Sequence, residues 1–362
     1  MKLNIIKIRL GELEDFVNSA KFGEFEIIPI TPVRAKSYLN NPNAKPNDSV
    51  LYLGFFKNQL VAFRSLFADK VNCGDEVTRF AWCSGNWVHP QFRRKGYSEQ
   101  LLKEAYSDWN KKLMFTNYAP DSENLYLKTG WFKPIHKFEG IKGYLFPKTR
   151  KLVKSSNRNA FLKTFYSVVD VLINITSFIR ISFFRPLKPS EFIFESVEFP
   201  DEACYKAIQI NNSRGIFDRG KEELKWIFNY PWISRVDNSH HKKYPFSSYS
   251  KSFCYQTIKI FKKTVFIGFF IFSLREGHLK TLYFSLPNEC VSEVTDYIRN
   301  YCVQNNVETV TIYKKEVANR LLQRKFPFLY VKKYGQKIYS TFDIKNVKKL
   351  KFQDGDGDLF FT

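Results

Sequence analysis

The segment 78–105 constrains the fold of this chain more than any other. An apolar run over 78–88 is typical of a β-strand, and apolar residues at helical spacing follow over 97–105. Between them lies a basic loop that contains Gly96. The first backbone N–H groups of a helix have no partner within it, and the helix dipole places about half a positive charge there. A strand, a glycine turn and a helix start in this order therefore predict a site for an anion such as pyrophosphate.

This loop resembles the coenzyme A signature of the GNAT acyltransferases. Arg93-x-x-Gly96-x-Ser98 matches Gln/Arg-x-x-Gly-x-Gly/Ala, with serine at the last small position. A second segment, 125–132, reads Leu-Tyr-Leu-Lys-Thr-Gly-Trp-Phe and resembles the family's Leu-Tyr-x-x-x-Gly-Phe. The resemblance covers residues 1–145 and implies acetyl-coenzyme A or another acyl-coenzyme A as co-substrate, without a metal. It assigns cofactor binding to Trp87, Val88, Arg93, Arg94, Lys95, Gly96, Tyr97, Ser98 and Asn117.

The resemblance also assigns chemical roles. A backbone N–H near Trp87 and Val88 polarises the acyl carbonyl. Tyr126 donates a proton to the departing thiolate, because its ordinary pKa of about 10 keeps the hydroxyl protonated. The alternative for Tyr126 is an aromatic side chain packed under Trp131.

Two parts of this site stay open. The family's asparagine, seven residues before the tyrosine, is replaced by Ala119, and Asn117 is close but out of register. The general base is not identified by the sequence. His89 adjoins Pro90 and is more typical of a turn. The carboxylates considered for the base are Glu26, Glu76 and Asp121.

The charge balance restricts the partners. The chain has 57 Lys and Arg against 35 Asp and Glu, a formal net charge of +22. Such a field attracts coenzyme A, phosphorylated sugars, nucleic acid or an acidic membrane. The cations are spread along the whole chain, which disfavours nucleic acid. Six cysteines without a Cys-x-x-Cys pair predict free thiols rather than a zinc site. With no secretory signal and no run near the roughly 20 apolar residues of a membrane span, we expect a cytoplasmic protein.

A long apolar segment, 161–184, follows the first half. It predicts one helix with a narrow polar stripe at spacings of three and four. We expect this helix to be buried between two domains. The alternative is a helix in the interface of the inner membrane face, with Arg180, Arg185 and Lys188 toward phospholipid. The stripe consists of Lys163, Ser167, Asp170, Asn174 and Ser177.

The second half repeats the predicted order of elements. Adjacent strands over 264–274 and 278–286 precede a helix, a strand, a further helix and a closing hairpin over 328–342. Where the basic loop should be, Ser285-Leu-Pro-Asn-Glu289 has neither glycine nor cation, so this half is a GNAT-like fold without coenzyme A binding. The fold class is α/β with mixed sheets, two GNAT-like domains in tandem joined by a long apolar helix. The predicted boundaries are 1–149 for the first domain, 150–189 for the linker helix, 190–345 for the degenerate domain and 346–362 for an acidic tail.

The tail carries Asp354, Asp356 and Asp358 at a spacing of two, as at the start of a calcium loop. It lacks the bidentate glutamate of that loop, so we expect a solvated acidic turn.

These observations predict an acyl-coenzyme A-dependent N-acyltransferase, most simply an N-acetyltransferase. Its acceptor is a primary amine of a small molecule or amino sugar, and the second half shapes the acceptor pocket. One alternative is a Fem-type aminoacyl transferase, whose aminoacyl-tRNA would suit the charge although the basic loop does not mark that family. The other is a non-catalytic protein that binds coenzyme A or a membrane surface.

Overall fold

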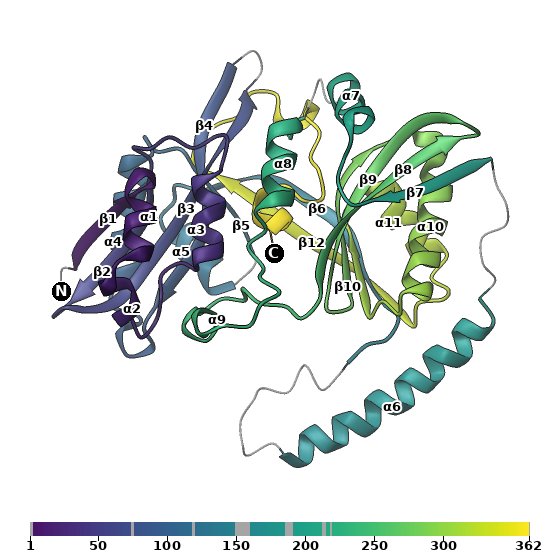
Figure 1. The fold of residues 1–362 in the computed structure, drawn as a ribbon, viewed down its shortest axis with the longest axis horizontal. Helices are drawn as coiled ribbons and strands as arrows, with labels where there is room; N and C mark the ends of the chain where they lie inside the picture. The colour runs from purple at the N-terminus through teal and green to yellow at the C-terminus, as the bar shows by residue number, and fades with distance from the viewer. Residues whose placement is uncertain are drawn as a thin grey trace. The chain divides into compact units, whose positions relative to one another are not determined.

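The computed structural model describes residues 3–73, 76–117, 120–148, 160–184, 191–211, 215–217 and 219–361. The chain divides into two compact units (Figure 1). Unit 1 consists of Met1–Lys137, Ile208–Phe253 and Gln336–Thr362, and unit 2 of Phe138–Ala207 and Cys254–Gly335. The segments 208–253 and 336–362, which the predicted boundaries assign to the second domain and the tail, thus belong to unit 1.

Unit 1 contains a mixed sheet in which every neighbouring pair is antiparallel except β4 with β5, which run parallel. The strand order is β1 (Asn4–Arg9), β2 (Ser49–Phe56), β3 (Gln59–Cys73), β4 (Glu76–Val88), β5 (Leu113–Thr116) and the C-terminal part of β12 (Tyr330–Ser340). β2 and β3 form an antiparallel hairpin. Its turn residues Lys57 and Asn58 have φ of 48° and 64°, as a two-residue type I′ turn requires.

Helices cover both faces of this sheet. Helix α4 (Tyr97–Asp108) places Leu101, Leu102 and Ala105 in a core shared with β2, β3 and β4, so the predicted helical face is confirmed. On the other face, Tyr38 of α3 (Pro32–Leu39) packs against Phe67 of β3 with ring centroids 6.2 Å apart. The other helices of unit 1 are α1 (Leu13–Asn18), α2 (Ala20–Glu24), α5 (Pro120–Lys128), α8 (Lys221–Asn229) and α9 (Ser239–Lys243).

Unit 2 repeats this arrangement of strands. β10 and β11 run parallel, as β4 and β5 do, and the other pairs with a defined register are antiparallel. Helix α10 (Val291–Gln304) packs its apolar side into the core beneath this sheet. The two GNAT-like halves predicted from the order of elements are therefore present. The strand order is β7 (Phe192–Val197), β8 (Phe253–Lys262), β9 (Val265–Arg275), β10 (His278–Ser285), β11 (Thr309–Ile312) and β6 (Lys133–Tyr144).

The outer strands of the two halves are exchanged. β6 follows the first half in sequence, yet it pairs antiparallel with β11 of unit 2. β12 follows the second half, yet its end pairs with β5 of unit 1. The predicted closing hairpin over 328–342 is therefore wrong. Gly335 has no positive φ that would make a turn, and Gln336 is buried, so the chain continues as one strand, β12.

The long helix predicted over 161–184 is confirmed as α6 (Ala160–Ser182). Its predicted burial is wrong, because seven of its large apolar side chains are exposed. By length and composition, α6 is a described helix able to cross a membrane, with a candidate span over Thr164–Ser182. The expectation that no segment approaches such a length is therefore also wrong. Arg185 and Lys188, which the membrane alternative places toward phospholipid, lie outside the described residues.

The prediction of a solvated acidic turn at 354–358 is wrong as well. Asp354, Asp356 and Asp358 are at most 7% exposed, and the following 3-10 helix η7 (Gly357–Phe361) contacts β4 and β5. Phe361 stacks on Trp232 with ring centroids 4.3 Å apart. Apolar residues after the acidic run, and cationic partners elsewhere in unit 1, make burial of this segment favourable.

Candidate functional site

β4 and β5 separate after a short parallel ladder. Among the described residues that ladder has two pairs, Ala81 with Leu113 and Trp82 with Met114. Beyond it β4 continues to Val88 and β5 to Thr116 without further pairing between them, while the other edge of β5 pairs with β12. The two strands therefore diverge on the side where β4 leads into the basic loop. Ligands of open α/β sheets bind at such divergent strand ends.

A β-bulge lies at the same place. In the pairing of β3 with β4, Ser65 lies opposite Gly85 and Leu66 opposite Cys83, so Ser84 is the extra residue. A bulge bends its strand and redirects backbone N–H groups and side chains, and bulges are common beside active sites. The bulge thus lies in residues 83–88 of β4, the part that pairs with β3 but, among the described residues, does not pair with β5.

The basic loop (residues 93–98) has the backbone geometry of an anion site. Arg94 and Gly96 have positive φ values of 62° and 75°, and Gly96 is the N-cap of α4. Glycine has no side chain that could accept a hydrogen bond from the first-turn N–H groups. A Cβ atom on Gly96 would meet nothing within 4 Å, so the space in front of the first-turn N–H groups is open. A negatively charged group is favoured there by the helix dipole.

The three cations of this loop, Arg93, Arg94 and Lys95, are all exposed. The Arg93 Nε lies 3.4 Å from the Val88 carbonyl oxygen, which ties the loop to the end of β4. The Lys95 ammonium lies 4.7 Å from the centre of the Phe92 ring. The loop therefore combines backbone donors with three full positive charges.

Beneath the loop lies a buried guanidinium. Arg64 of β3 is fully buried and donates from Nη1 to the Tyr126 hydroxyl at 2.7 Å. Its Nη2 donates to Asn86 Oδ1 at 3.2 Å and to Ser98 Oγ at 3.3 Å. Ser98 Oγ in turn donates to Asn86 Oδ1 at 2.6 Å. Within the described part of the chain none of the partners of Arg64 is a carboxylate, so its positive charge adds to the field at the head of α4.

Tyr126 lies at the other end of this network. It is 3% exposed and packs on Phe115 with ring centroids 4.2 Å apart. Burial raises the pKa of Tyr126, and the Arg64 guanidinium opposes that rise. The hydroxyl thus accepts from Arg64 and keeps its own proton. Trp131 stacks on Tyr106 with ring centroids 4.1 Å apart and packs against the same apolar cluster as Tyr126, so both interpretations of Tyr126, proton donor and packed aromatic, stay open.

On the opposite face of β4, the bulge residue contacts a carboxylate. Ser84 Oγ donates to Asp358 Oδ2 at 3.1 Å and accepts from Arg34 Nη2 at 2.7 Å. Arg34 also donates to the hydroxyls of Tyr38 and Tyr244. Asp358 is 7% exposed. The end of the chain thus brings a buried carboxylate to the bulge, on the face away from Tyr126.

Two other predicted residues have structural partners. Asn117 Oδ1 accepts from the Lys337 N–H at 2.6 Å and its Nδ2 donates to Glu123, which joins β5 to β12. His89 Nδ1 accepts from the Gln91 N–H at 3.3 Å, the turn role predicted for it. Ala119 and the side chain of Asp121 lie outside the described residues.

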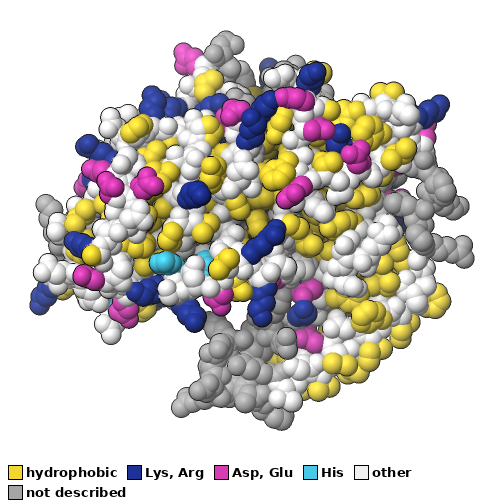
Figure 2. All heavy atoms as spheres, viewed as in Figure 1, with side chains coloured by type: hydrophobic (Ala, Val, Ile, Leu, Met, Phe, Trp, Pro, Cys, Tyr) yellow, Lys and Arg dark blue, Asp and Glu magenta, His cyan; other side chains and the backbone are white. Residues whose placement is uncertain are grey.

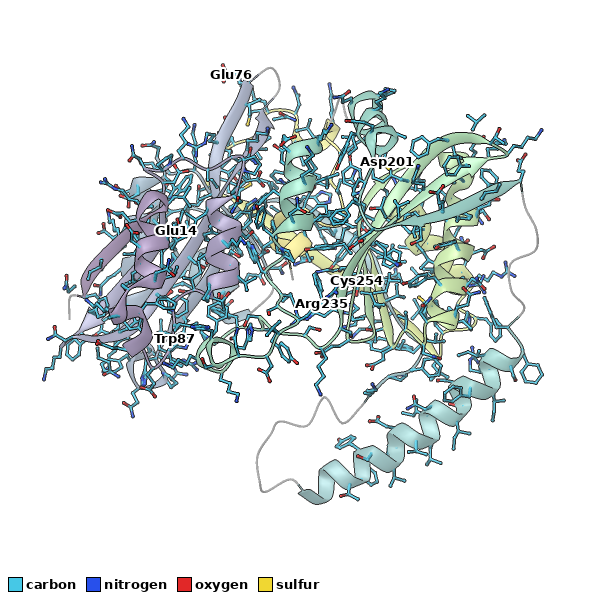
Figure 3. All side chains as sticks on the ribbon, viewed as in Figure 1. Glu14, Glu76, Trp87, Asp201, Arg235 and Cys254 are labelled. Atoms are coloured by element: carbon cyan, nitrogen blue, oxygen red, sulfur yellow. The ribbon has the colours of Figure 1, made fainter. Side chains whose placement is uncertain are left out.

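The two remaining candidate bases lie far apart. Glu76 begins β4 and Trp87 lies near its other end (Figure 3). Glu26 lines a pocket of about 270 Å³ together with Trp87 and His89. Of the two, Glu26 is the carboxylate near the divergent end of β4. The same pocket is lined by Glu24, Phe25 and Phe55, which gives it both negative charge and aromatic walls.

Sequence reasoning missed Arg64, Asn86 and Asp358. Arg64 carried a signal, since it is a charge inside the apolar run of 60–68. Asn86 precedes Trp87 in the strand and has no distinguishing neighbour. Asp358 is distant in sequence from the other site residues, and its approach to Ser84 depends on tertiary structure alone.

Comparison with known proteins places this geometry in a known fold. The sequence matches no family model and no curated protein. A probable N-acyltransferase from Enterococcus faecalis matches 94% of this chain and 72% of its own, with a TM-score of 0.52 and 10% identity. The fold is that of the GNAT acyltransferases. N-myristoyltransferase from Saccharomyces cerevisiae, solved with bound myristoyl-coenzyme A, matches 95% of this chain and 83% of its own, with a TM-score of 0.52 and 12% identity. The resemblance predicted from the motifs is confirmed at the level of the GNAT fold.

Proposed function

We propose that the protein is an acyl-coenzyme A-dependent N-acyltransferase, most simply an N-acetyltransferase. The observation that best supports this proposal is the N-terminus of α4. There a glycine N-cap at φ 75° and three exposed cations adjoin the divergence of β4 from β5. The GNAT fold supports the same reaction class. The acceptor is a primary amine of a small molecule or an amino sugar.

The basic loop is the binding site for the pyrophosphate of the donor. The backbone N–H groups of residues 94–98 and the side chains of Arg93, Arg94 and Lys95 hold it. The unpaired edge of β4 at Trp87 and Val88 binds the pantetheine arm and offers a backbone N–H to the thioester carbonyl. The open space over Gly96 supports this role, because a side chain there would fill the approach.

Tyr126 is the general acid that protonates the departing thiolate. Its hydroxyl accepts from Arg64, which orients the remaining proton away from the guanidinium. Its raised pKa keeps the proton on the oxygen until a thiolate forms nearby. Arg64 acts as a positioning residue, holding Tyr126, Asn86 and Ser98 in one network.

The amine approaches from the opposite face of β4. The pocket beside Trp87 carries Glu24 and Glu26, which attract a protonated amine, and aromatic walls that favour a cation. Asp358 is a buried carboxylate that accepts a hydrogen bond from Ser84 at the bulge, and it is the proposed base. The proposed acid and the proposed base thus lie on the two faces of the sheet where β4 diverges from β5.

The decisive experiment measures acyl-coenzyme A binding by titration calorimetry and coenzyme A release against a panel of amines that includes amino sugars. The test variant is Gly96→Asp, and the matched control is Gly130→Asp. Gly130 also has a positive φ, 72°, and nothing within 4 Å of an added Cβ, so both variants carry the same backbone strain.

A carboxylate about 4 Å from a phosphate costs between about 1 kcal/mol in bulk water and about 4 kcal/mol near a protein surface. We therefore expect Gly96→Asp to lose roughly tenfold or more in affinity relative to Gly130→Asp. Equal binding by the two folded variants, or no binding by the parent chain, would overturn the proposal.

A further inference from the structure

Helix α6 turns its polar side chains toward the protein and its apolar side chains toward solvent, the opposite of a usual surface helix. Its polar stripe faces the protein, where Asp170 is 7% exposed and Ser177 is fully buried. Its apolar side chains face outward, each about half exposed or more, and Figure 2 shows them along the outer edge of the helix at the lower right. They are Phe165, Val168, Val171, Leu172, Ile175, Phe178, Ile179 and Phe183. A contiguous exposed apolar surface of this kind marks an interaction site.

The inward face is fixed to unit 2 by specific contacts. Ser177 Oγ donates to the Leu145 carbonyl oxygen at 2.6 Å, and Arg180 Nη2 donates to the Phe328 carbonyl oxygen at 3.2 Å. Ile181 packs against the core of unit 2. These contacts orient the helix about its axis, so the apolar face cannot turn inward without breaking them.

The charges in the sequence around α6 indicate what kind of surface its apolar face binds. Between Glu139 and Glu191 the sequence has one acidic residue, Asp170, which faces inward. The same stretch has ten cations: Lys142, Lys148, Arg150, Lys151, Lys154, Arg158, Lys163, Arg180, Arg185 and Lys188. Arg180 donates to a carbonyl oxygen of unit 2, Lys148 pairs with Glu308, and most of the others lie outside the described residues. An apolar helix face whose flanking sequence is this basic matches the interface of a membrane that contains anionic phospholipid, where the acyl region takes the apolar side chains and the headgroups take the cations.

The topology excludes a transmembrane orientation. The 23 residues of α6 span about 34 Å at 1.5 Å per residue, so length alone would permit a crossing. However, β6 before the helix and β7 after it both lie in the sheet of unit 2, paired with β11 and β8. A crossing helix would place its two ends on opposite sides, and one flanking segment would have to recross the bilayer with unpaired backbone groups.

We propose that α6 lies in the plane of a membrane and binds anionic phospholipid through its outward apolar face. This surface is separate from the residues of the proposed catalytic site, so its test does not depend on that site. Membrane binding would hold unit 2 at the bilayer surface while α4 and the basic loop belong to unit 1.

The test is flotation of the full chain with vesicles of phosphatidylcholine plus phosphatidylglycerol, and with vesicles of phosphatidylcholine alone. The variant replaces Leu172, Ile179 and Phe183 with serine. The matched control replaces Ile210, Val236 and Val265 with serine, because these side chains are 77%, 69% and 64% exposed and lie outside α6. Circular dichroism and thermal melting verify that each variant is folded.

We expect the parent and the control to float with the anionic vesicles and the α6 variant to lose at least tenfold in vesicle affinity. Binding should weaken with added salt, and alkaline carbonate should release the protein. Equal flotation of the α6 variant and the control would overturn the proposal. Resistance to carbonate would overturn the in-plane orientation. A parent that does not float but forms an oligomer, lost in the α6 variant, would assign the face to a second copy of the chain instead.

Discussion

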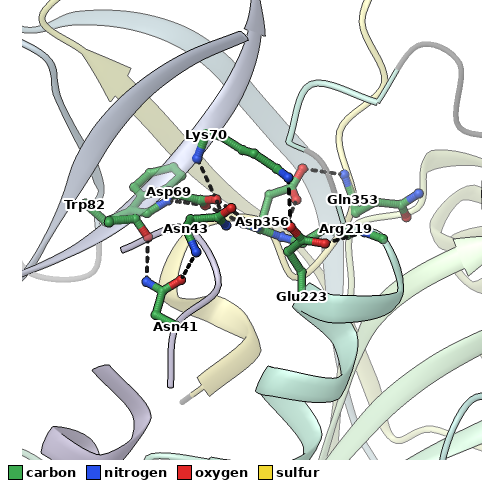
Figure 4. Close-up of polar contacts among 11 residues, drawn as sticks. Asn41, Asn43, Asp69, Lys70, Trp82, Arg219, Glu223, Gln353 and Asp356 are labelled. Carbon is green, nitrogen blue, oxygen red and sulfur yellow. Dashed lines mark hydrogen bonds and ion pairs between the residues drawn. The ribbon is translucent and has the colours of Figure 1, made fainter. Parts of the chain in front are cut away.

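Asp356 is expected to make the stability of unit 1 depend on pH in an unusual direction. One buried guanidinium, Arg219, faces two carboxylates (Figure 4). It donates to both oxygens of Asp69, at 3.0 and 2.8 Å, whereas Asp356 Oδ1 lies 3.9 Å from its Nε. Trp82 Nε1 also donates to Asp69, and the Gln353 N–H donates to Asp356. Asp69 rather than Asp356 therefore forms the close ion pair with Arg219. Burial raises the pKa of Asp356 to about 7, and Arg219 only partly opposes it.

The size of the effect follows from that pKa. In the unfolded chain the Asp356 carboxyl has its ordinary pKa of 3.8. Between this value and about 7 the folded state holds a proton that the unfolded state releases, so the free energy of unfolding falls as the pH rises. The slope is about 1.4 kcal/mol per pH unit, and the total is about 4 kcal/mol. The stabilisation is complete below the unfolded pKa and is lost once the pH exceeds about 7.

The perturbation is Asp356→Asn, which keeps an oxygen for the Gln353 N–H and removes the titration. Urea unfolding between pH 5 and pH 8 gives the free energy of unfolding of both proteins, and their difference cancels the titration of all other groups. We expect the variant to gain on the parent by about 1.4 kcal/mol per pH unit up to pH 7, and the difference to level off above it. Curves that run parallel would refute the argument. The contrasting variant Asp69→Asn leaves Arg219 without its ion pair and should lose about 3–5 kcal/mol at every pH.

Three further outcomes are expected. Tyr126→Phe removes only the proposed acid, so it should lower kcat by roughly a hundredfold or more. Acyl-coenzyme A binding, measured by calorimetry, should be retained. An unchanged kcat would assign Tyr126 to packing. Asp358→Asn should lower kcat with the same retention of donor binding, and amines of low pKa should lose least if the carboxylate acts as a base. Burial lowers the pKa of His136 to about 4, and its ring stacks on Phe352 at 3.7 Å, so the parent should lose stability as the pH falls below about 6. His136→Phe should remove that loss in acid unfolding, and an identical acid transition in both proteins would contradict it.

Local signals allowed much of unit 1 to be predicted. The two residues Lys57 and Asn58 between alternating apolar runs specify a hairpin, because a two-residue turn fixes the register of its strands. Gly96 between an apolar strand and a helical pattern specifies the start of α4. Each of these features depends on residues close together in sequence, where backbone preference and side-chain spacing act directly.

The errors arose where distant segments decide the structure. The sequence predicts a closing hairpin over 328–342, but the C-terminal end of β12 pairs with β5, which is far away in sequence, and the segment forms one strand. The acidic residues of 354–358 indicated a solvated turn, whereas Arg219 and Ser84 supply partners inside unit 1. The α6 stripe was read correctly as polar, but only the contacts of Ser177 and Arg180 establish which face lies inward.

The buried charges of β3 show which further signal the sequence contained. Arg64 and Asp69 are single charges within a long apolar strand, and a charge in such a place is costly unless it is paired or bound. Their spacing of five residues, an odd number, directs them to opposite faces of the sheet. Arg64 joins Tyr126 and the head of α4 on one face, while Asp69 meets Arg219 on the other. A buried charge on each face of one strand therefore predicts two polar centres in unit 1. The structure adds that one belongs to the proposed donor site and the other holds the C-terminal segment that brings Asp358 to the bulge.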